Sequence, residues 1–464
     1  MLTAFILLYL LCTILIGLVA ARRVKKSEDF ALAGRNLPFY LSLSSFFATW
    51  FGAETILGAS SRFAELGLKG IIEDPLGASL CLVLVGLFFV KYLYSKSYIS
   101  IGDFFRDRYG RGFELFSSLL QALSYFTYTS AQFVALALVM QTVLPLSFLA
   151  CLVVGSSLVV LYTFWGGMWA VAITDLVQSL VIVVGLCALT FFLSLHASPA
   201  KIPFLSLLRQ QSSDFFPAPH FHDWAKFMAA WMVMGFGSIP SQDVFQRVMA
   251  AKSEKVASQS ASWAGIVYLA VALLPLYIVT RCLQIADHSI ADTQQIIPKL
   301  VMEHTPVAIQ ALFFGALLSA ILSTASASLL AQATVIGENL IKPALKNPSD
   351  AQMLLIFRIM VLAVSLVSIV IALFYQDIFL LSSLSSSVVL VTLFVPMALG
   401  LWWPTSSEWA AYASALTGLA TYIGCSLLGW DMLAVFWGFF ASLLGFLAVG
   451  VVSCRKKITP IGKH

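Results

Sequence analysis

The sequence has little charge, and it has no clustered cysteine or histidine. Only 11% of its 464 residues are charged, whereas 60% are hydrophobic; a soluble globular protein does not have this composition. The seven cysteines are scattered and form no CxxC pair or Cys/His group, which argues against structural disulfides and metal centres. A Ser/His/Asp constellation, an HExxH motif and a P-loop are also missing, so we expect neither an enzyme nor a bound cofactor.

Long apolar runs are what the sequence has instead. Runs of this length cross a bilayer as helices, and they predict an all-α polytopic membrane protein, with the lipid bilayer as its surroundings. The first run has no basic segment before it and is followed by a positive cluster, so we interpret it as a retained helix and not as a signal peptide. We expect about thirteen transmembrane helices, at residues 2–20, 38–60, 73–95, 113–143, 147–165, 169–195, 224–242, 258–282, 306–335, 351–375, 378–402, 408–429 and 431–453.

The positive charges predict the orientation in the membrane. If the first helix runs inward, twenty of the 27 Lys and Arg residues lie on the cytoplasmic side and seven lie outside. Because cytoplasmic loops are enriched in Lys and Arg, we expect a multi-pass protein of the cell (inner or plasma) membrane with its N-terminus outside and its C-terminus in the cytoplasm. The net charge of +5 then reflects topology and contact with anionic lipid, and not nucleic-acid binding.

Two of the expected helices are interrupted, 38–60 at residues 51–54 and 224–242 at residues 235–240. In lipid a broken helix is tolerated where its backbone is buried in protein or lines a cavity, and such breaks mark transport sites. The two breaks lie five helices apart, which is typical of an inverted repeat of five plus five helices. We therefore expect one transmembrane domain, 1–464, made of a peripheral first helix and basic inner loop (1–37), two repeats (38–195 and 224–402), two peripheral last helices (408–453) and a cytoplasmic tail (454–464).

Three residues of the run 306–335 have the spacing of an oxygen-lined helix face. Ala320, Ser323 and Thr324 fall at i, i+3 and i+4, so one carbonyl and two hydroxyls lie together on a helix. Hard cations prefer oxygen ligands. Ser and Thr also bond back to their own helix or pack against a neighbouring one, and the spacing alone does not separate the two interpretations.

Four motifs together resemble the sodium:solute symporter family: ATWFGAETILG at 48–58, WGGMWAVAITDLVQ at 165–178, GSIPSQDVFQRVMAAKS at 237–253 and LLSAILSTASASLLAQATVIGENL at 317–340. The sequence is most similar to the high-affinity choline transporter branch and its bacterial relatives. The resemblance implies a leucine-transporter-type fold. It also implies a sodium site formed by backbone oxygens of Ala48 and Phe51 together with Ala320, Ser323 and Thr324.

Some members of this family bind a second sodium ion. The resemblance places it between Asp175 and hydroxyls one turn beyond Ser323 and Thr324 in the helix 306–335. Ser326 matches one of these hydroxyls, but Ala327 replaces the other. Asp175 has two other possible roles, as the N-cap of the helix 169–195 or as the partner of a loop arginine.

The substrate is expected between the two breaks, near the middle of the membrane. Trp50 directly precedes the first break, and an indole face binds organic ammonium groups well; packing is its alternative role. In the choline branch a tryptophan here belongs to the substrate cage, and the position of the second cage tryptophan is Ser241 in this chain.

Acidic residues at membrane depth are costly and often functional. Glu54 is expected to attract an amine or to bond to the unwound backbone. Asp74 precedes Pro75 as an N-cap does, and Asp243 is expected to pair with Arg247 at i+4. The candidate substrate-binding residues are Trp50, Glu54, Thr55, Asp74, Tyr128 and Ser241.

The sequence therefore predicts a sodium-coupled symporter that imports a small organic solute by alternating access. An amine or a zwitterion, choline-like or amino-acid-like, is the expected solute, and Na+ is the coupling ion. A proton-coupled transporter with Glu54 or Asp175 as the proton carrier is the first alternative, and a membrane solute sensor that does not transport is the second. The sequence does not give the oligomeric state.

Overall fold

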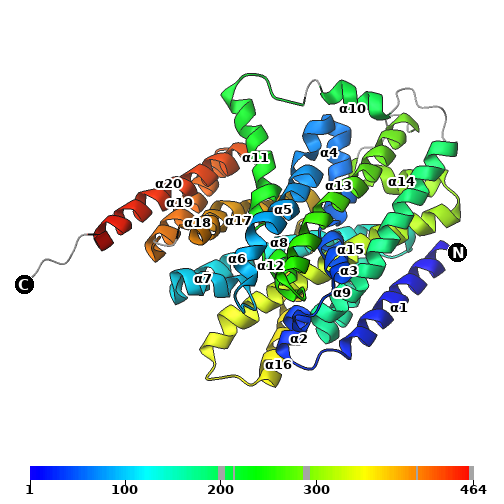
Figure 1. The fold of residues 1–464 in the computed structure, drawn as a ribbon. Helices are drawn as coiled ribbons and strands as arrows, with labels where there is room; N and C mark the ends of the chain where they lie inside the picture. The colour runs from blue at the N-terminus through cyan, green and yellow to red at the C-terminus, as the bar shows by residue number, and fades with distance from the viewer. Residues whose placement is uncertain (197–203, 213–214, 286–292, 404–405, 459–464) are drawn as a thin grey trace, which may run out of the picture.

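The computed structural model describes residues 1–196, 204–212, 215–285, 293–403 and 406–458, and these form helices throughout (Figure 1). Within these ranges the β-structure is one isolated bridge between Leu37 and Ala251. Nine helices of the described part are long and apolar enough to cross a membrane. The expectation of an all-α membrane protein is thus confirmed, whereas the last residues of the expected tail, 459–464, lie outside the described residues.

Twenty α-helices follow one another along the chain. They are α1 Leu2–Ala21, α2 Ser27–Leu32, α3 Phe39–Trp50, α4 Ala59–Leu66, α5 Ala78–Leu84, α6 Val90–Tyr94, α7 Ile101–Tyr109, α8 Arg111–Val143, α9 Phe148–His196, α10 Phe204–Ser212, α11 Phe221–Gly237, α12 Gln242–Ala250, α13 Glu254–Ile285, α14 Ile296–His304, α15 Val307–Val335, α16 Asp350–Phe374, α17 Ile378–Val389, α18 Val395–Trp402, α19 Glu408–Leu427 and α20 Asp431–Ile458. Five π-helical turns continue some of these helices, η2 Glu54–Gly58, η4 Ile72–Gly77, η5 Val85–Phe89, η7 Ile336–Ile341 and η9 Leu390–Phe394.

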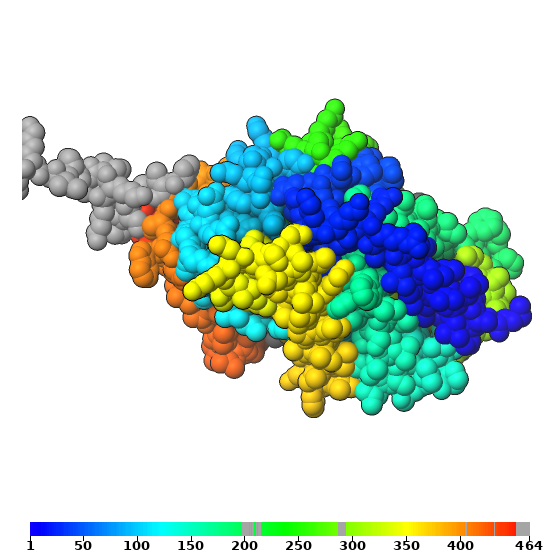
Figure 2. Space-filling view, turned by 90° about the horizontal axis from the view of Figure 1, so that it is seen from below, coloured from blue at the N-terminus to red at the C-terminus, as the bar shows by residue number. Residues whose placement is uncertain are grey.

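Helix α15 lies at the centre of the molecule. It is buried on all sides from Phe313 to Val335, as expected for a helix that other helices surround. Its neighbours include α1, α3, α8, α9, α12 and α16. Helix α1 packs on α9 at one end of the molecule, and α19 and α20 pair with each other at the other end (Figures 1 and 2).

Helix α9 joins two spans that the sequence predicted to be separate, 147–165 and 169–195. The chain turns within the helix at Gly167, which has φ 49° and ψ −142°. A Cβ atom there would lie 2.5 Å from the carbonyl oxygen of Phe30. Only glycine combines this backbone conformation with so close a contact, so a glycine kink replaces the expected loop.

Buried amide side chains join helices on the side of the molecule away from α10 and α14, where Figure 1 shows α7 and α12. Gln121 donates to the carbonyl of Pro240 (2.7 Å), and Gln242 accepts from the backbone N–H of Ile101 (2.8 Å). These amides are fully buried, and we call them the amide layer: Gln121, Gln242, Gln246, Gln332 and Asn339. The layer ties the short helices α7 and α12 to α8 and to the segment after α15.

Candidate functional site

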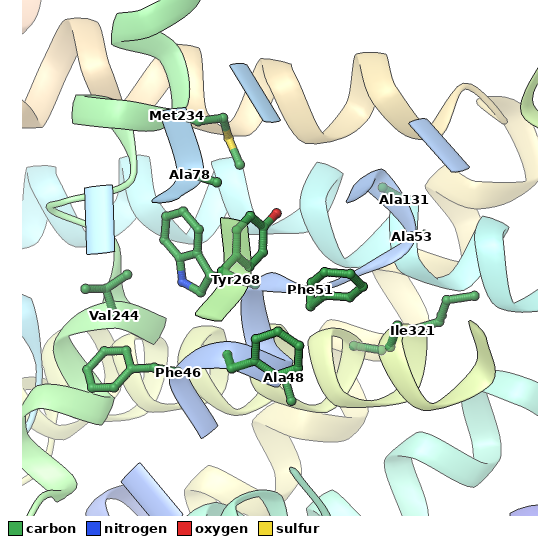
Figure 3. Packing of buried hydrophobic residues seen from close by; sticks show 14 of the residues in the cluster. Phe46, Ala48, Phe51, Ala53, Ala78, Ala131, Met234, Val244, Tyr268 and Ile321 are labelled. Carbon is green, nitrogen blue, oxygen red and sulfur yellow. The ribbon is translucent and has the colours of Figure 1, made fainter. Parts of the chain in front are cut away.

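The break in the third helix lies in the protein interior. Helix α3 ends at Trp50, Phe51 leaves the helical conformation with φ −84° and ψ 71°, and helical structure resumes with the π turn at Glu54. A helix that ends inside a protein leaves its last carbonyls without intrahelical donors. Ala48 lies in that last turn, and both Ala48 and Phe51 are fully buried. Figure 3 shows Phe51 beside Tyr268 of α13, with Ile321 of α15 on its other side.

The oxygen-bearing face of α15 meets this break. Ala320, Ser323 and Thr324 are all fully buried, and a Cβ atom on Gly52 would lie 2.8 Å from Oγ1 of Thr324. The Thr324 hydroxyl donates to the carbonyl of Ala320 at 3.1 Å, which is the back-bond that the sequence left open. A hydroxyl that donates one hydrogen bond still has lone pairs for a cation, so the back-bond and a ligand role are compatible.

Asp175 of α9 joins this site to two other helices. Its carboxylate accepts from Ser323 Oγ at 2.5 Å and from Ser45 Oγ at 2.6 Å, and the Arg247 guanidinium of α12 lies 3.9 Å away. The expected arginine partner is therefore present, whereas the N-cap role is wrong because Asp175 lies well inside α9. Asp175 thus contacts the predicted sodium site directly.

Asp175 and Ser326, the residues suggested for a second sodium ion, form no hydrogen bond with each other in the described structure. The hydroxyl of Ser326 donates to the Ser323 carbonyl of its own helix at 2.9 Å. Asp175 bonds to Ser323 and Ser45 instead. The structure therefore groups Asp175 with the first candidate site.

The chemistry of the first site suits a hard monovalent cation. Its available groups are backbone carbonyls, two hydroxyls and a nearby carboxylate, all of them oxygen donors. The charge of Asp175 is offset by Arg247, and both side chains are fully enclosed. In the described part of the chain no group of three His, Cys, Asp or Glu residues forms a metal centre, so a transition metal has no comparable site there.

A small cavity of about 20 Å³ lies beside the break. Three of the predicted substrate residues line it, namely Trp50, Tyr128 and Ser241. A space of that volume holds about one water molecule. A solute therefore requires the walls to move apart.

The other three predicted substrate residues do not line this cavity. Glu54 accepts hydrogen bonds from the Tyr128 hydroxyl and from Gln132, both at 2.9 Å. It therefore contacts Tyr128 of the cavity wall without lining the cavity itself. Thr55 donates to Asp74 at 2.9 Å, and the Tyr268 hydroxyl donates to the same carboxylate. The expected N-cap bond of Asp74 is not formed, because its side chain holds Thr55 and Tyr268.

Sequence reasoning missed the part that Asp243 plays. Arg247 donates to the backbone carbonyl of Asp243 at 2.8 Å, so the expected pairing of the two side chains at i+4 is wrong. The Asp243 carboxylate instead accepts from the Tyr125 hydroxyl, and both residues line the small cavity. The sequence did contain one indication of this role: Asp243 follows the second break directly, and the structure places it in the first turn of α12.

A second cavity of about 580 Å³ lies between α4, α11, α17 and α20. We call it the vestibule. Its polar lining includes Arg62, Lys69, Glu73 and Asp377. Helix α17 borders both spaces, because Ser383 lines the vestibule and Ser386 lines the small cavity. The two cavities therefore lie along one helix.

The comparisons with known proteins agree with this geometry. The profile of the sodium:solute symporter family matches residues 30–418. The high-affinity choline transporter 1 of Caenorhabditis elegans is 27% identical over 444 residues, which cover 90% of this chain and 76% of that protein. The sodium/pantothenate symporter of Haemophilus influenzae is 24% identical over 416 residues, which cover 86% of this chain and 84% of that one.

The structure of a Na+-coupled sialic acid symporter superimposes with a TM-score of 0.83 at 18% identity, covering 98% of both chains. The predicted leucine-transporter-type fold agrees with such fold neighbours. The family match confirms the expectation that the protein is a transporter and not an enzyme, and it confirms the resemblance found in the sequence. The chain therefore belongs to the sodium:solute symporter family, as a multi-pass membrane protein that moves a small solute together with sodium.

Proposed function

We propose that this protein imports a small organic solute, an amine or a zwitterion, by sodium-driven alternating access. One observation carries the proposal. The interrupted end of α3 touches the hydroxyl face of α15 at Gly52 and Thr324, so a cation bound there holds the two helices together. Movement of one helix relative to the other then makes and breaks the ion site.

The proposed sodium ligands are the backbone oxygens of Ala48 and Phe51 with the oxygens of Ala320, Ser323 and Thr324. The Ser323 hydroxyl donates a hydrogen bond to Asp175, which leaves the lone pairs of its oxygen free to bind a cation. We propose one sodium ion and not two, because Ala327 replaces one hydroxyl of the second site and Asp175 is already bonded to Ser45 and Ser323. Sodium entry favours the state in which α3 and α15 are in contact, and an inward gradient then drives uptake.

The proposed topology has thirteen crossings. The interrupted helices α3–α4 and α11–α12 count as one crossing each, and the kinked α9 counts as two. Residues 38–195 and 224–402 form the inverted repeat, with α1, α19 and α20 at the periphery. With the N-terminus outside, the vestibule opens to the exterior and the amide layer faces the cytoplasm.

The relatives do not determine the solute. One relative is named for choline and another for pantothenate, which differ in charge. The proposed solute lies in the small cavity against Trp50, Tyr128 and Ser241, with Glu54 behind them. Thr55 and Asp74 support this wall through Tyr268 and are proposed to act without direct solute contact.

The proposal is tested by thermal unfolding of the purified protein in detergent, in sodium and potassium series of equal ionic strength. Ligand linkage predicts a sodium-specific stabilisation of about 1.4 kcal/mol at roughly ten times Kd. The double variant Ser323→Ala with Thr324→Ala is expected to lose it. The matched control is Ser260→Ala with Thr280→Ala, two hydroxyls that bond back within α13.

Identical sodium and potassium curves for the wild type contradict the sodium site. They would favour the proton-coupled alternative, which predicts uptake driven by a pH gradient in sodium-free proteoliposomes. A sodium response with no gradient-driven uptake of any solute would favour a sensor.

A further inference from the structure

We propose that Asp243 is the residue that recognises the solute, and that the solute is a protonated amine with at least one N–H bond and a neutral acceptor oxygen. The inference rests on the proposed symport function and narrows its substrate class. It starts from the cavity beside the break, where Asp243 shares the wall with Trp50, Tyr125 and Tyr128.

The charges around this cavity favour a cation. Asp243 is the one charged residue among the described residues that line it, and no Lys, Arg or His is among them. Glu54 adds a second carboxylate directly behind Tyr128. The guanidinium of Arg247 does not line the cavity; it lies 3.9 Å from Asp175 and donates to the backbone carbonyls of Ser45 and Asp243. An organic cation therefore meets two carboxylates that no cation in the cavity wall offsets.

The position of Asp243 disfavours a solute with a carboxylate. A helix N-terminus ordinarily attracts anions through its free N–H groups and its dipole. Helix α12 begins at Gln242, next to the cavity, and Asp243 puts its own negative charge into that first turn. The Tyr125 hydroxyl oxygen accepts a hydrogen bond from the backbone N–H of Asp243 at 2.9 Å. The N-terminus of α12 is thus already occupied, and the helical turn that begins at Glu54 in the first break also carries a carboxylate of its own. Both helix starts therefore favour an amine over a zwitterion.

Two features favour a solute that donates and accepts hydrogen bonds. A carboxylate forms its strongest neutralising contact with an N–H donor, and a quaternary ammonium has none. The described cavity lining has one indole, that of Trp50, so a quaternary group finds no second tryptophan to stack on there. The indole Nε1 of Trp50 is buried and has no hydrogen-bond partner in the described structure. Buried donors are nearly always paired, so a hydroxyl or ether oxygen of the solute fits there.

The size of the cavity sets a further condition. At about 20 Å³ it holds no solute until its walls separate, so a small molecule needs the least movement. The wall also carries hydroxyls from two helices, at Ser124 of α8 and at Ser385 and Ser386 of α17, together with Ser238 and Ser241 at the second break. Such a wall suits a short polar amine such as an amino alcohol.

The test uses ethanolamine and three probes that each differ from it at one group: N,N-dimethylethanolamine and choline at the nitrogen, and β-alanine at the hydroxyl. Thermal unfolding of the full chain in detergent is followed while each probe is titrated at saturating sodium. The two amines without a carboxylate that carry an N–H bond, ethanolamine and N,N-dimethylethanolamine, are expected to stabilise the protein, with apparent affinities at least tenfold above those of choline and β-alanine. A tenfold ratio corresponds to about 1.4 kcal/mol.

The variant Asp243→Asn keeps the shape of the side chain and removes its charge. It is expected to lower the apparent affinity for ethanolamine and N,N-dimethylethanolamine at least tenfold, while the stabilisation by sodium persists. The control Asp223→Asn removes a carboxylate at the start of α11, away from the cavity, and is expected to bind the amines as the wild type does. If Asp243→Asn does not fold, the wild-type affinities for the four probes still test the proposed substrate class.

Three results would overturn the inference. They are a higher affinity for choline or β-alanine than for the two amines, unchanged amine binding in Asp243→Asn, and no response of the wild type to any probe up to about 10 mM. A sodium response that persists in these cases leaves the proposed symport intact. Loss of the wild-type sodium response contradicts the proposed function itself.

Discussion

At the scale of single residues, Gly52 decides how closely the broken helix approaches α15. An added Cβ would lie 2.6 Å from Oε2 of Glu54 and 2.8 Å from Oγ1 of Thr324. Both side chains are held by hydrogen bonds, so neither moves without loss. We expect Gly52→Ala to cost about 1–3 kcal/mol of stability and to abolish sodium-specific stabilisation, measured by thermal unfolding in sodium and in potassium.

The control for this change lies in the following helical turn. At Gly58 an added Cβ would lie 3.4 Å from Phe379 and 3.9 Å from Cβ of Glu54, which are ordinary contacts. Gly58→Ala is therefore expected to keep both stability and the sodium response. A sodium response that survives in Gly52→Ala would show that the break does not contribute to the ion site.

Asp175 and Arg247 form a buried pair whose members depend on each other. Breaking a buried ion pair leaves an uncompensated charge, so Asp175→Asn and Arg247→Met are each expected to cost about 3 kcal/mol. The double variant is expected to cost less than the sum of the two. Unfolding by SDS titration in mixed micelles measures this coupling, and additive losses would show that the two charges act independently.

Part of the site follows from sequence and part does not. The helical period brings Ala320, Ser323 and Thr324 onto one face, and the short-range pattern is enough to predict this. The contacts of Asp175 with Ser45 and Ser323 span 130 and 148 residues. Such contacts depend on how helices pack, which a single sequence does not encode in any local pattern. The same reason explains why the role of Asp243 was missed.

At the scale of helices, the kink in α9 is the most demanding backbone feature. Gly167 has φ 49° and ψ −142°, a conformation that costs other residues about 1–3 kcal/mol, and a Cβ there would meet the Phe30 carbonyl at 2.5 Å. Gly167→Ala is therefore expected to lower the unfolding free energy by more than this strain alone. Detergent unfolding and expression level measure the loss.

Gly424 in α19 provides the comparison. A Cβ there would meet nothing within 4 Å, and alanine favours a helix over glycine by about 1 kcal/mol. Gly424→Ala is expected to be neutral or stabilising. Equal losses in the two variants would contradict the account of the kink.

Hydropathy located the helices better than it located their connections. Each expected apolar run falls on a helix, because spanning length and apolar composition are local properties. The division of α3 from α4 and of α11 from α12 was visible as glycine and polar residues in apolar runs. The fusion of 147–165 with 169–195 was not visible, because the contact between Gly167 and Phe30 joins distant parts of the chain.

At the scale of the whole molecule, the proposed orientation is directly measurable. His220 and Lys346 are exposed in loops that the topology puts on opposite sides. In a cysteine-free background, His220→Cys is expected to react with an impermeant maleimide on intact cells, whereas Lys346→Cys reacts only after permeabilisation. The reverse pattern would invert the topology and put the vestibule on the cytoplasmic side.

The smallness of the cavity beside the break has a consequence for osmosis. A chamber of about 20 Å³ lies between the vestibule and the amide layer and holds about one water molecule, which does not form the continuous file of water that osmotic flow requires. A cell can therefore carry many copies of this protein without becoming more permeable to water. Liposomes that contain it are expected to shrink in hypertonic sucrose as slowly as protein-free liposomes, as stopped-flow light scattering can show.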